Sequence, residues 1–134
     1  RFGPTLRESI LMHSISRLVL HPHISNIQTS WVKMGIQGVI RCLNSGANDL
    51  GGTLMNESIT KAAGAEHGQE FMAKEMNKLI TSIGKKPRQR TTLYENVTDE
   101  TMRRGLKNIP LKPIKNELIN RKERENSAIQ VQSI

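Results

Sequence analysis

An amide, a carboxylate and a pair of glycines stand together in the middle of the chain. Asn48 and Asp49 are adjacent, and Gly51, Gly52 and Thr53 follow directly. A carboxylate accepts hydrogen bonds from a polar ligand, and glycines without side chains let the backbone come close to it. The same residues also allow a structural interpretation, in which Asp49 and Thr53 only cap the element that follows. The pattern alone leaves both interpretations open.

Two strands and one helix would position this polar group. Residues 24–32 are rich in β-branched side chains and predict a strand, and residues 36–43 carry one apolar helical face. Gly46 suits the end of that helix, and residues 47–50 predict a second strand. A strand, a helix and a strand in this order favour a parallel pair, the unit of a parallel sheet or barrel.

The carboxyl ends of two parallel strands lie at the same edge of their sheet. In a barrel this edge faces the active site, so Gln28 and Ser30 should lie near Asn48 and Asp49. Trp31 either belongs to this mouth or fills the core below it. The sequence thus predicts one polar site built from both strands.

Helices precede and follow this unit. Thr5 can cap a helix of about 15 residues that ends before Pro22, and a second helix is expected over residues 69–83, with a short one between them at residues 58–63. Thr98 and Asp99 could start a further short helix. The first helix should bury one face through its apolar positions, which are Leu6, Ile10, Leu11, Ile15, Leu18 and Val19.

Four stretches of the sequence resemble the C-terminal part of FO synthase. They are LMHSISRLVLHP (11–22), NIQTSWVKMG (26–35), GANDLGGTLMNESITKAAGAEHGQEF (46–71) and PRQRTTLY (87–94). That family consists of radical S-adenosylmethionine enzymes that make the 8-hydroxy-5-deazaflavin chromophore of coenzyme F420, and the similar half attaches the tyrosine-derived hydroxybenzyl group. The resemblance implies that the PRQRTTLY peptide returns towards the barrel.

The resemblance also implies the architecture. The expected fold is α/β, formed by the C-terminal βα units of a radical S-adenosylmethionine TIM-type barrel that is incomplete, followed by helices and a basic extended tail. Residues 1–96 would form the barrel portion, and residues 97–134 a basic tail that binds a partner. Two strands cannot close a barrel, so the missing N-terminal barrel part or a larger assembly should cover the exposed edges.

The resemblance implies a substrate site as well. His67, in the loop of residues 64–68, is either a substrate contact or an ordinary loop histidine. The residues expected to contact the diaminouracil-ribityl substrate, tyrosine or S-adenosylmethionine are Gln28, Ser30, Asn48, Asp49, Thr53 and His67.

Cysteine content limits the chemistry of the chain by itself. A radical S-adenosylmethionine enzyme needs three cysteines in a C-x-x-x-C-x-x-C loop for its 4Fe-4S cluster, and this sequence contains only Cys42. We therefore expect no cofactor, metal or catalytic residue in this chain. His13, His21 and His23 are expected to be structural or exposed.

Two functional hypotheses follow. The chain is the C-terminal fragment of an FO synthase-like enzyme, contributes substrate-binding residues and has no activity alone; its first residue, Arg1, suggests that an upstream piece is missing. Alternatively, it is a catalytically inactive, FO synthase-derived accessory or scaffold subunit of a larger complex, for example in an organelle. Finding no cysteine loop upstream would exclude the first hypothesis.

Charge and composition add weaker constraints. The net charge of +8 would attract nucleic acid, an anionic membrane surface or an acidic protein, or it would simply keep the chain soluble. The positive run at residues 85–90 has no interleaved aromatic residues, so nonspecific binding to nucleic acid is the only kind it favours. A single cysteine and no apolar run of about 20 residues indicate a reducing compartment, cytoplasmic or organellar with the plastid stroma included, and no transmembrane segment.

Overall fold

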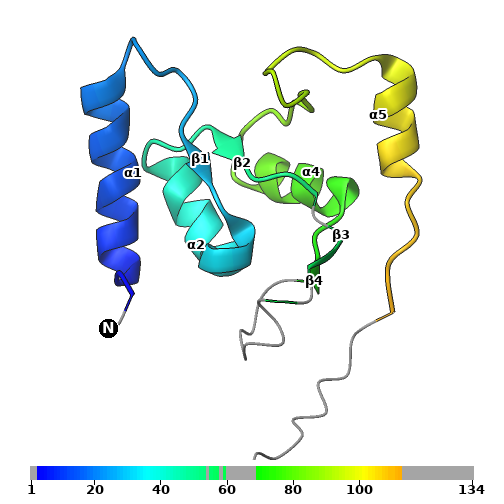
Figure 1. The fold of residues 1–134 in the computed structure, drawn as a ribbon, viewed down its shortest axis with the longest axis horizontal. Coiled ribbons are helices and arrows are strands. Elements are labelled where there is room, and N and C mark those ends of the chain that lie inside the picture. Colours follow the sequence, from blue (N-terminus) through cyan, green and yellow to red (C-terminus); the bar gives the residue numbers. More distant parts are fainter. Residues whose placement is uncertain (1–2, 54, 58, 60–68, 113–134) are drawn as a thin grey trace, which may run out of the picture.

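The computed structural model describes residues 3–53, 55–57, 59 and 69–112. In Figure 1 the described chain is an open α/β arrangement, with a helix at each end and short strands between them. Its elements are α1 (Leu6–Leu20), β1 (Gln28–Thr29), α2 (Trp31–Asn44), β2 (Asp49–Leu50), β3 (Met55–Glu57), β4 (Gln69–Glu70), α4 (Ala73–Ser82) and α5 (Asp99–Leu106).

The predicted strand, helix and strand unit is present, and its strands are parallel. Gln28 of β1 lies opposite Asp49 of β2, and Thr29 lies opposite Leu50. This confirms the parallel pair, which forms a two-stranded sheet among the described residues. The arrangement is consistent with part of a barrel.

The first strand is shorter than the sequence predicted. The predicted strand over residues 24–32 is wrong at both ends, because β1 spans Gln28–Thr29 and α2 begins at Trp31 with Ser30 as its N-cap residue. Gly35 interrupts the helix with φ 62° and ψ 176°, a conformation that glycine adopts without steric cost. This kink lets Trp31 and Val32 be buried at the start of the helix instead of in the strand.

The helix α1 begins where the sequence predicted. The Thr5 hydroxyl accepts a hydrogen bond from the Glu8 amide, and the Glu8 carboxylate accepts one from the Thr5 amide at 2.7 Å. α1 packs beside α2 (Figure 1), and Ser14 Oγ donates to the Ser45 carbonyl at 2.6 Å.

The predicted buried face of α1 is wrong within the described structure, since none of the helix's residues is buried. Ile15 is 52% exposed and Leu18 is 80% exposed. The reason is that α2 packs against one side of α1, while Leu11 and Val19 also remain exposed on the rest of its apolar stripe.

The core lies between α2, the strands and Phe71. The Trp31 and Phe71 rings meet edge to face with centroids 5.6 Å apart, and Trp31 Nε1 donates to the Gly52 carbonyl at 3.1 Å. Trp31 is therefore a core residue, and its indole holds the Gly-Gly turn. The buried apolar cluster consists of Trp31, Val32, Val39, Cys42, Leu43, Ala47 and Phe71.

The second half contains an antiparallel strand pair that the sequence did not predict. The predicted helix over residues 69–83 starts late, because Gln69 and Glu70 form β4, antiparallel to β3, and α4 begins at Ala73. Glu75 accepts a hydrogen bond from the Met72 amide at 3.1 Å, which fixes this start. The expected short helix at residues 58–63, the loop at 64–68 and the chain from 113 onward lie outside the described residues.

The helix α5 begins at Asp99, as predicted. Thr98 caps it by accepting a hydrogen bond from the Thr101 amide. In the part of the chain that the structure describes, no helix combines the length and apolar character needed to cross a bilayer.

Candidate functional site

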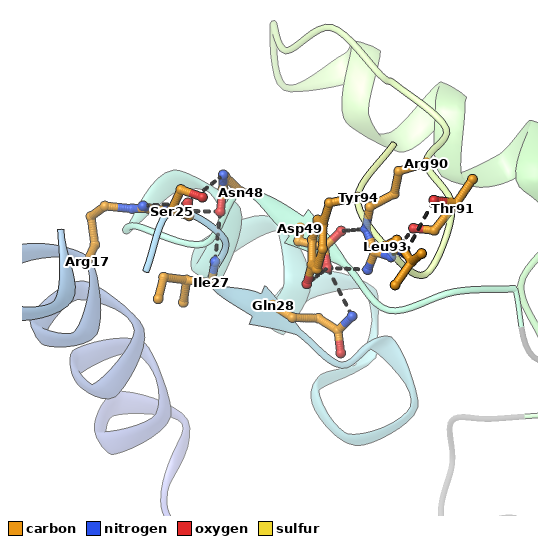
Figure 2. Close-up of polar contacts among 10 residues, drawn as sticks. All are labelled: Arg17, Ser25, Ile27, Gln28, Asn48, Asp49, Arg90, Thr91, Leu93 and Tyr94. Carbon is orange, nitrogen blue, oxygen red and sulfur yellow. Dashed lines mark hydrogen bonds and ion pairs between the residues drawn. The ribbon is translucent and has the colours of Figure 1, made fainter. Parts of the chain in front are cut away.

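The carboxylate of Asp49 is the centre of the polar site (Figure 2). Arg90 contacts it at two points: Nε donates to Oδ1 at 2.7 Å, and Nη2 donates to Oδ2. This forked arrangement matches the planar geometries of guanidinium and carboxylate. The Asp49 side chain is 10% exposed and that of Arg90 is 21% exposed, so the pair is largely shielded from water.

Two further side chains complete the group. Gln28 Nε2 donates to Asp49 Oδ2 at 2.9 Å from the neighbouring strand, and the Tyr94 hydroxyl lies 3.4 Å from the same oxygen. The Arg90 guanidinium lies over the Tyr94 ring, 4.2 Å from its centroid. The site thus joins β1, β2 and a segment about 40 residues further along the chain.

A tight turn presents Arg90 and Tyr94 together. The Thr91 amide donates to the Glu95 carbonyl at 2.9 Å, and the Thr91 hydroxyl accepts from the Leu93 and Glu95 amides. Tyr94 has a φ of 64°, which turns the chain back on itself. The PRQRTTLY peptide therefore does return to the sheet, as the resemblance implied.

The surroundings keep Asp49 ionised. Partial burial raises the pKa of Asp49, but the hydrogen bond from Arg90, the hydrogen bond from Gln28, the charge of Arg90 and the Tyr94 hydroxyl together lower it below its ordinary value of 3.8. The hydrogen bond to Asp49 raises the pKa of Arg90 in turn. At neutral pH the pair is a carboxylate facing a guanidinium.

Asn48 lies apart from this group, although it is the next residue in the chain. Its Oδ1 accepts hydrogen bonds from Arg17 Nη2 at 2.6 Å and from the Ile27 amide at 2.9 Å, and its Nδ2 donates to the Ser25 carbonyl at 3.1 Å. Successive side chains along an extended chain point in opposite directions, so Asn48 faces α1 and the start of β1 (Figure 2). In this position it joins three segments of the chain.

Three further predicted site residues remain, namely Ser30, Thr53 and His67. Ser30 is exposed and precedes α2, where its carbonyl accepts a hydrogen bond from the Met34 amide. Thr53 is exposed in the loop after β2. His67 lies outside the described residues. The structure therefore brings together Gln28 and Asp49 among the predicted set, and a role in substrate binding stays a prediction for all six.

Arg90 and Tyr94 were not predicted as members of the site. Arg90 belonged to a run of positive charges and Tyr94 to the end of a family motif, so neither position indicated a contact with Asp49. The signal that could have found them is the Asp49 carboxylate itself, since a nearby cation stabilises a partly buried carboxylate.

The iron-sulfur cluster of radical S-adenosylmethionine enzymes does not fit this chain. Such a cluster needs three thiolates, whereas Cys42 is the single cysteine of the sequence and is fully buried in the core. Among the described residues there is no group of three histidine, cysteine or acidic side chains that could hold a metal ion.

Comparison with known proteins gives one consistent result. The family model described as the CofH/MqnC C-terminal region matches residues 4–103. FO synthase of Streptomyces coelicolor is 48% identical over 103 residues, which cover 77% of this chain and 12% of that protein. FO synthase of Mycobacterium leprae is 49% identical over 94 residues, covering 70% of this chain and 11% of that protein.

A relative with a different name matches the chain as well. The 5-amino-6-(D-ribitylamino)uracil–L-tyrosine 4-hydroxyphenyl transferase 1 of Methanosarcina barkeri is 45% identical over 99 residues, covering 74% of this chain and 26% of that protein. The chain thus spans a small part of the length of these relatives. No solved structure matches it.

Proposed function

Because the chain belongs to the CofH/MqnC C-terminal family, we propose that it is the C-terminal segment of an FO synthase-type radical S-adenosylmethionine enzyme of deazaflavin biosynthesis. Within that enzyme its β1 and β2 form the closing part of the barrel. The segment binds and orients substrate, and the upstream part of the enzyme holds the 4Fe-4S cluster and S-adenosylmethionine.

One observation supports this assignment most directly: Arg90 and Tyr94 converge with Gln28 and Asp49, which face each other on the two parallel strands. Each of these two-residue strands reaches its carboxyl end at the next residue, Thr29 or Leu50. In parallel α/β sheets, ligands bind beyond the carboxyl ends of the strands. A site at this edge needs polar side chains held in fixed positions, and the Asp49–Arg90 pair provides such support.

The names of the relatives suggest the substrates. The Methanosarcina protein is named for 5-amino-6-(D-ribitylamino)uracil and L-tyrosine. We assign these two substrates to the complete enzyme that would contain this chain. Its own residues would contribute polar contacts from Gln28, and also from Ser30 and Thr53 on neighbouring loops.

A fusion enzyme tests the proposal. The full chain is joined in place of the matching segment of the Streptomyces coelicolor FO synthase, the cluster is reconstituted, and deazaflavin formation is measured by fluorescence. We expect the fusion to form product, and the enzyme truncated before the segment to form none. A fusion that is folded and loaded with its cluster, yet no more active than the truncated enzyme, would contradict the proposal.

Matched variants separate the site from the scaffold. Asp49→Ala in the fusion should reduce product formation at least tenfold, since it removes the support of the site. Asp99→Ala replaces an exposed aspartate at the start of α5 and should leave activity within about twofold.

A further inference from the structure

We propose that Asp49 and Arg90 are positioning residues that hold the Gln28 side-chain amide in one orientation, with its carbonyl oxygen directed to the ligand. The site would therefore select a neutral group that carries N–H donors, such as the edge of a uracil ring. This inference rests on the proposed function and identifies which of the two substrates lies at β1.

The ionisation of Asp49 determines which end of the Gln28 amide faces it. An ionised carboxylate only accepts hydrogen bonds, and the contacts of Asp49 keep it ionised at neutral pH. The group of Gln28 that lies 2.9 Å from Oδ2 must therefore be its NH₂. The carbonyl oxygen of the same amide then points away from Asp49, as Figure 2 shows.

Asp49 has several hydrogen-bond partners within the chain. Its two oxygens receive hydrogen bonds from Arg90, Gln28 and Tyr94, so its acceptor sites are largely taken by residues of the chain. Arg90 also neutralises its charge. Asp49 consequently supports the site from behind and does not compete as the ligand's own partner.

Gln28 is the residue that remains available to a ligand. It is exposed as the first residue of β1, and its side-chain carbonyl oxygen is a fixed hydrogen-bond acceptor beside a neutralised ion pair. An acceptor of this kind favours N–H donors and disfavours a carboxylate, whose oxygens would face the carbonyl oxygen. The N–H donors of the uracil ring fit this acceptor, and the carboxylates of tyrosine and of S-adenosylmethionine do not. The ammonium groups of those two molecules also carry N–H donors, so the KM values of the two substrates must distinguish between them.

The test compares Gln28→Met with Gln37→Met in the fusion enzyme described above. Methionine keeps the length of the side chain but has no carbonyl oxygen, and Gln37 is an exposed glutamine on α2, away from the site. For Gln28→Met we expect the KM for 5-amino-6-(D-ribitylamino)uracil to rise about 3- to 10-fold, with kcat and the KM for tyrosine within about twofold. Gln37→Met should change none of the three.

A second variant keeps the inference testable if Gln28→Met does not fold. Asp49→Asn preserves the shape of the side chain but allows the Gln28 amide to flip, so the same KM should rise by a smaller factor. An unchanged KM for the uracil in the folded variant, or an equal rise for both substrates, would overturn the inference. An inactive unmodified fusion would instead count against the proposed function, so the two failures are distinguishable.

Discussion

Asp49, the first residue of β2, and Arg90, 41 residues further along the chain, form a two-point ion pair that anchors the turn of residues 90–95 to the parallel strands. Glu70 makes a second long-range connection, since its carboxylate accepts a hydrogen bond from the Leu111 amide at 2.8 Å. Two polar contacts thus connect the segment after α4 to earlier strands, in addition to the packing of α5 on α4, and the first of these contacts coincides with the candidate site.

The strength of this ion pair can be measured with a double-mutant cycle. Asp49→Ala, Arg90→Ala and the double variant are compared in the full chain by urea denaturation, followed by helical circular dichroism. We expect each single substitution to lower the free energy of unfolding by about 1–3 kcal/mol, and the double variant to lose less than the sum, with a coupling energy of about 1–2 kcal/mol.

The matched control for this cycle is Arg88→Ala, which replaces an exposed arginine two residues before Arg90. Its effect on the free energy of unfolding should stay within about 0.5 kcal/mol and should add to that of Asp49→Ala. Strict additivity of Asp49→Ala and Arg90→Ala would show that the pair adds no stability.

The ion pair should also make stability depend on pH in acid. The pKa of Asp49 is lowered in the folded chain, so its contribution is fully present above its unfolded value of 3.8 and is lost as the pH falls through the folded pKa. The difference in unfolding free energy between the unmodified chain and Asp49→Asn should be constant above about pH 5 and shrink below about pH 4. A difference that grew towards acid would contradict the lowered pKa.

Local patterns predicted the elements that depend on local chemistry. The starts of α1 after Thr5 and of α5 after Thr98 follow from hydroxyl caps, and the parallel pairing of β1 and β2 follows from two predicted strands on either side of a helix. Even the start of α2 at Trp31, ahead of the helix predicted over residues 36–43, has a local cause, the glycine at position 35, although its effect is clear only with the structure in hand.

Contacts between distant segments could not be predicted in the same way. Asn48 and Asp49 looked like one polar pair, because a sequence does not display which side of the sheet each residue faces. The pairing of Asp49 with Arg90 depends on a turn at Tyr94 with positive φ, which tyrosine rarely adopts. The exposure of Leu18 depends on which elements lie against α1, a question of tertiary structure and not of helical periodicity.

Gly46 should tolerate a side chain poorly. Its φ is 125°, and an added Cβ would lie 2.9 Å from the His13 carbonyl oxygen and 3.0 Å from Arg17 Cβ, where α1 packs closely on the end of α2. Gly46→Ala should therefore lower the free energy of unfolding by about 2–4 kcal/mol, from both backbone strain and displacement of α1. Gly84→Ala is the control: its φ is 73° but its Cβ would meet nothing within 4 Å, so we expect about 1–2 kcal/mol. Equal losses in urea denaturation would mean that the contact with α1 is unimportant.

A substitution of Asn48 can distinguish a structural role of this side chain from a role in substrate binding. Its side chain joins Arg17, the Ile27 amide and the Ser25 carbonyl, so Asn48→Ala leaves three polar groups without this partner and should lower the free energy of unfolding by about 1–3 kcal/mol. Asn44→Ala, at the exposed end of α2, should cost less than about 0.5 kcal/mol. In the fusion enzyme a supporting role predicts that Asn48→Ala reduces the amount of folded enzyme and leaves the KM of both substrates within about twofold. A rise in one KM at unchanged stability would instead place Asn48 among the substrate contacts, as the sequence resemblance suggested.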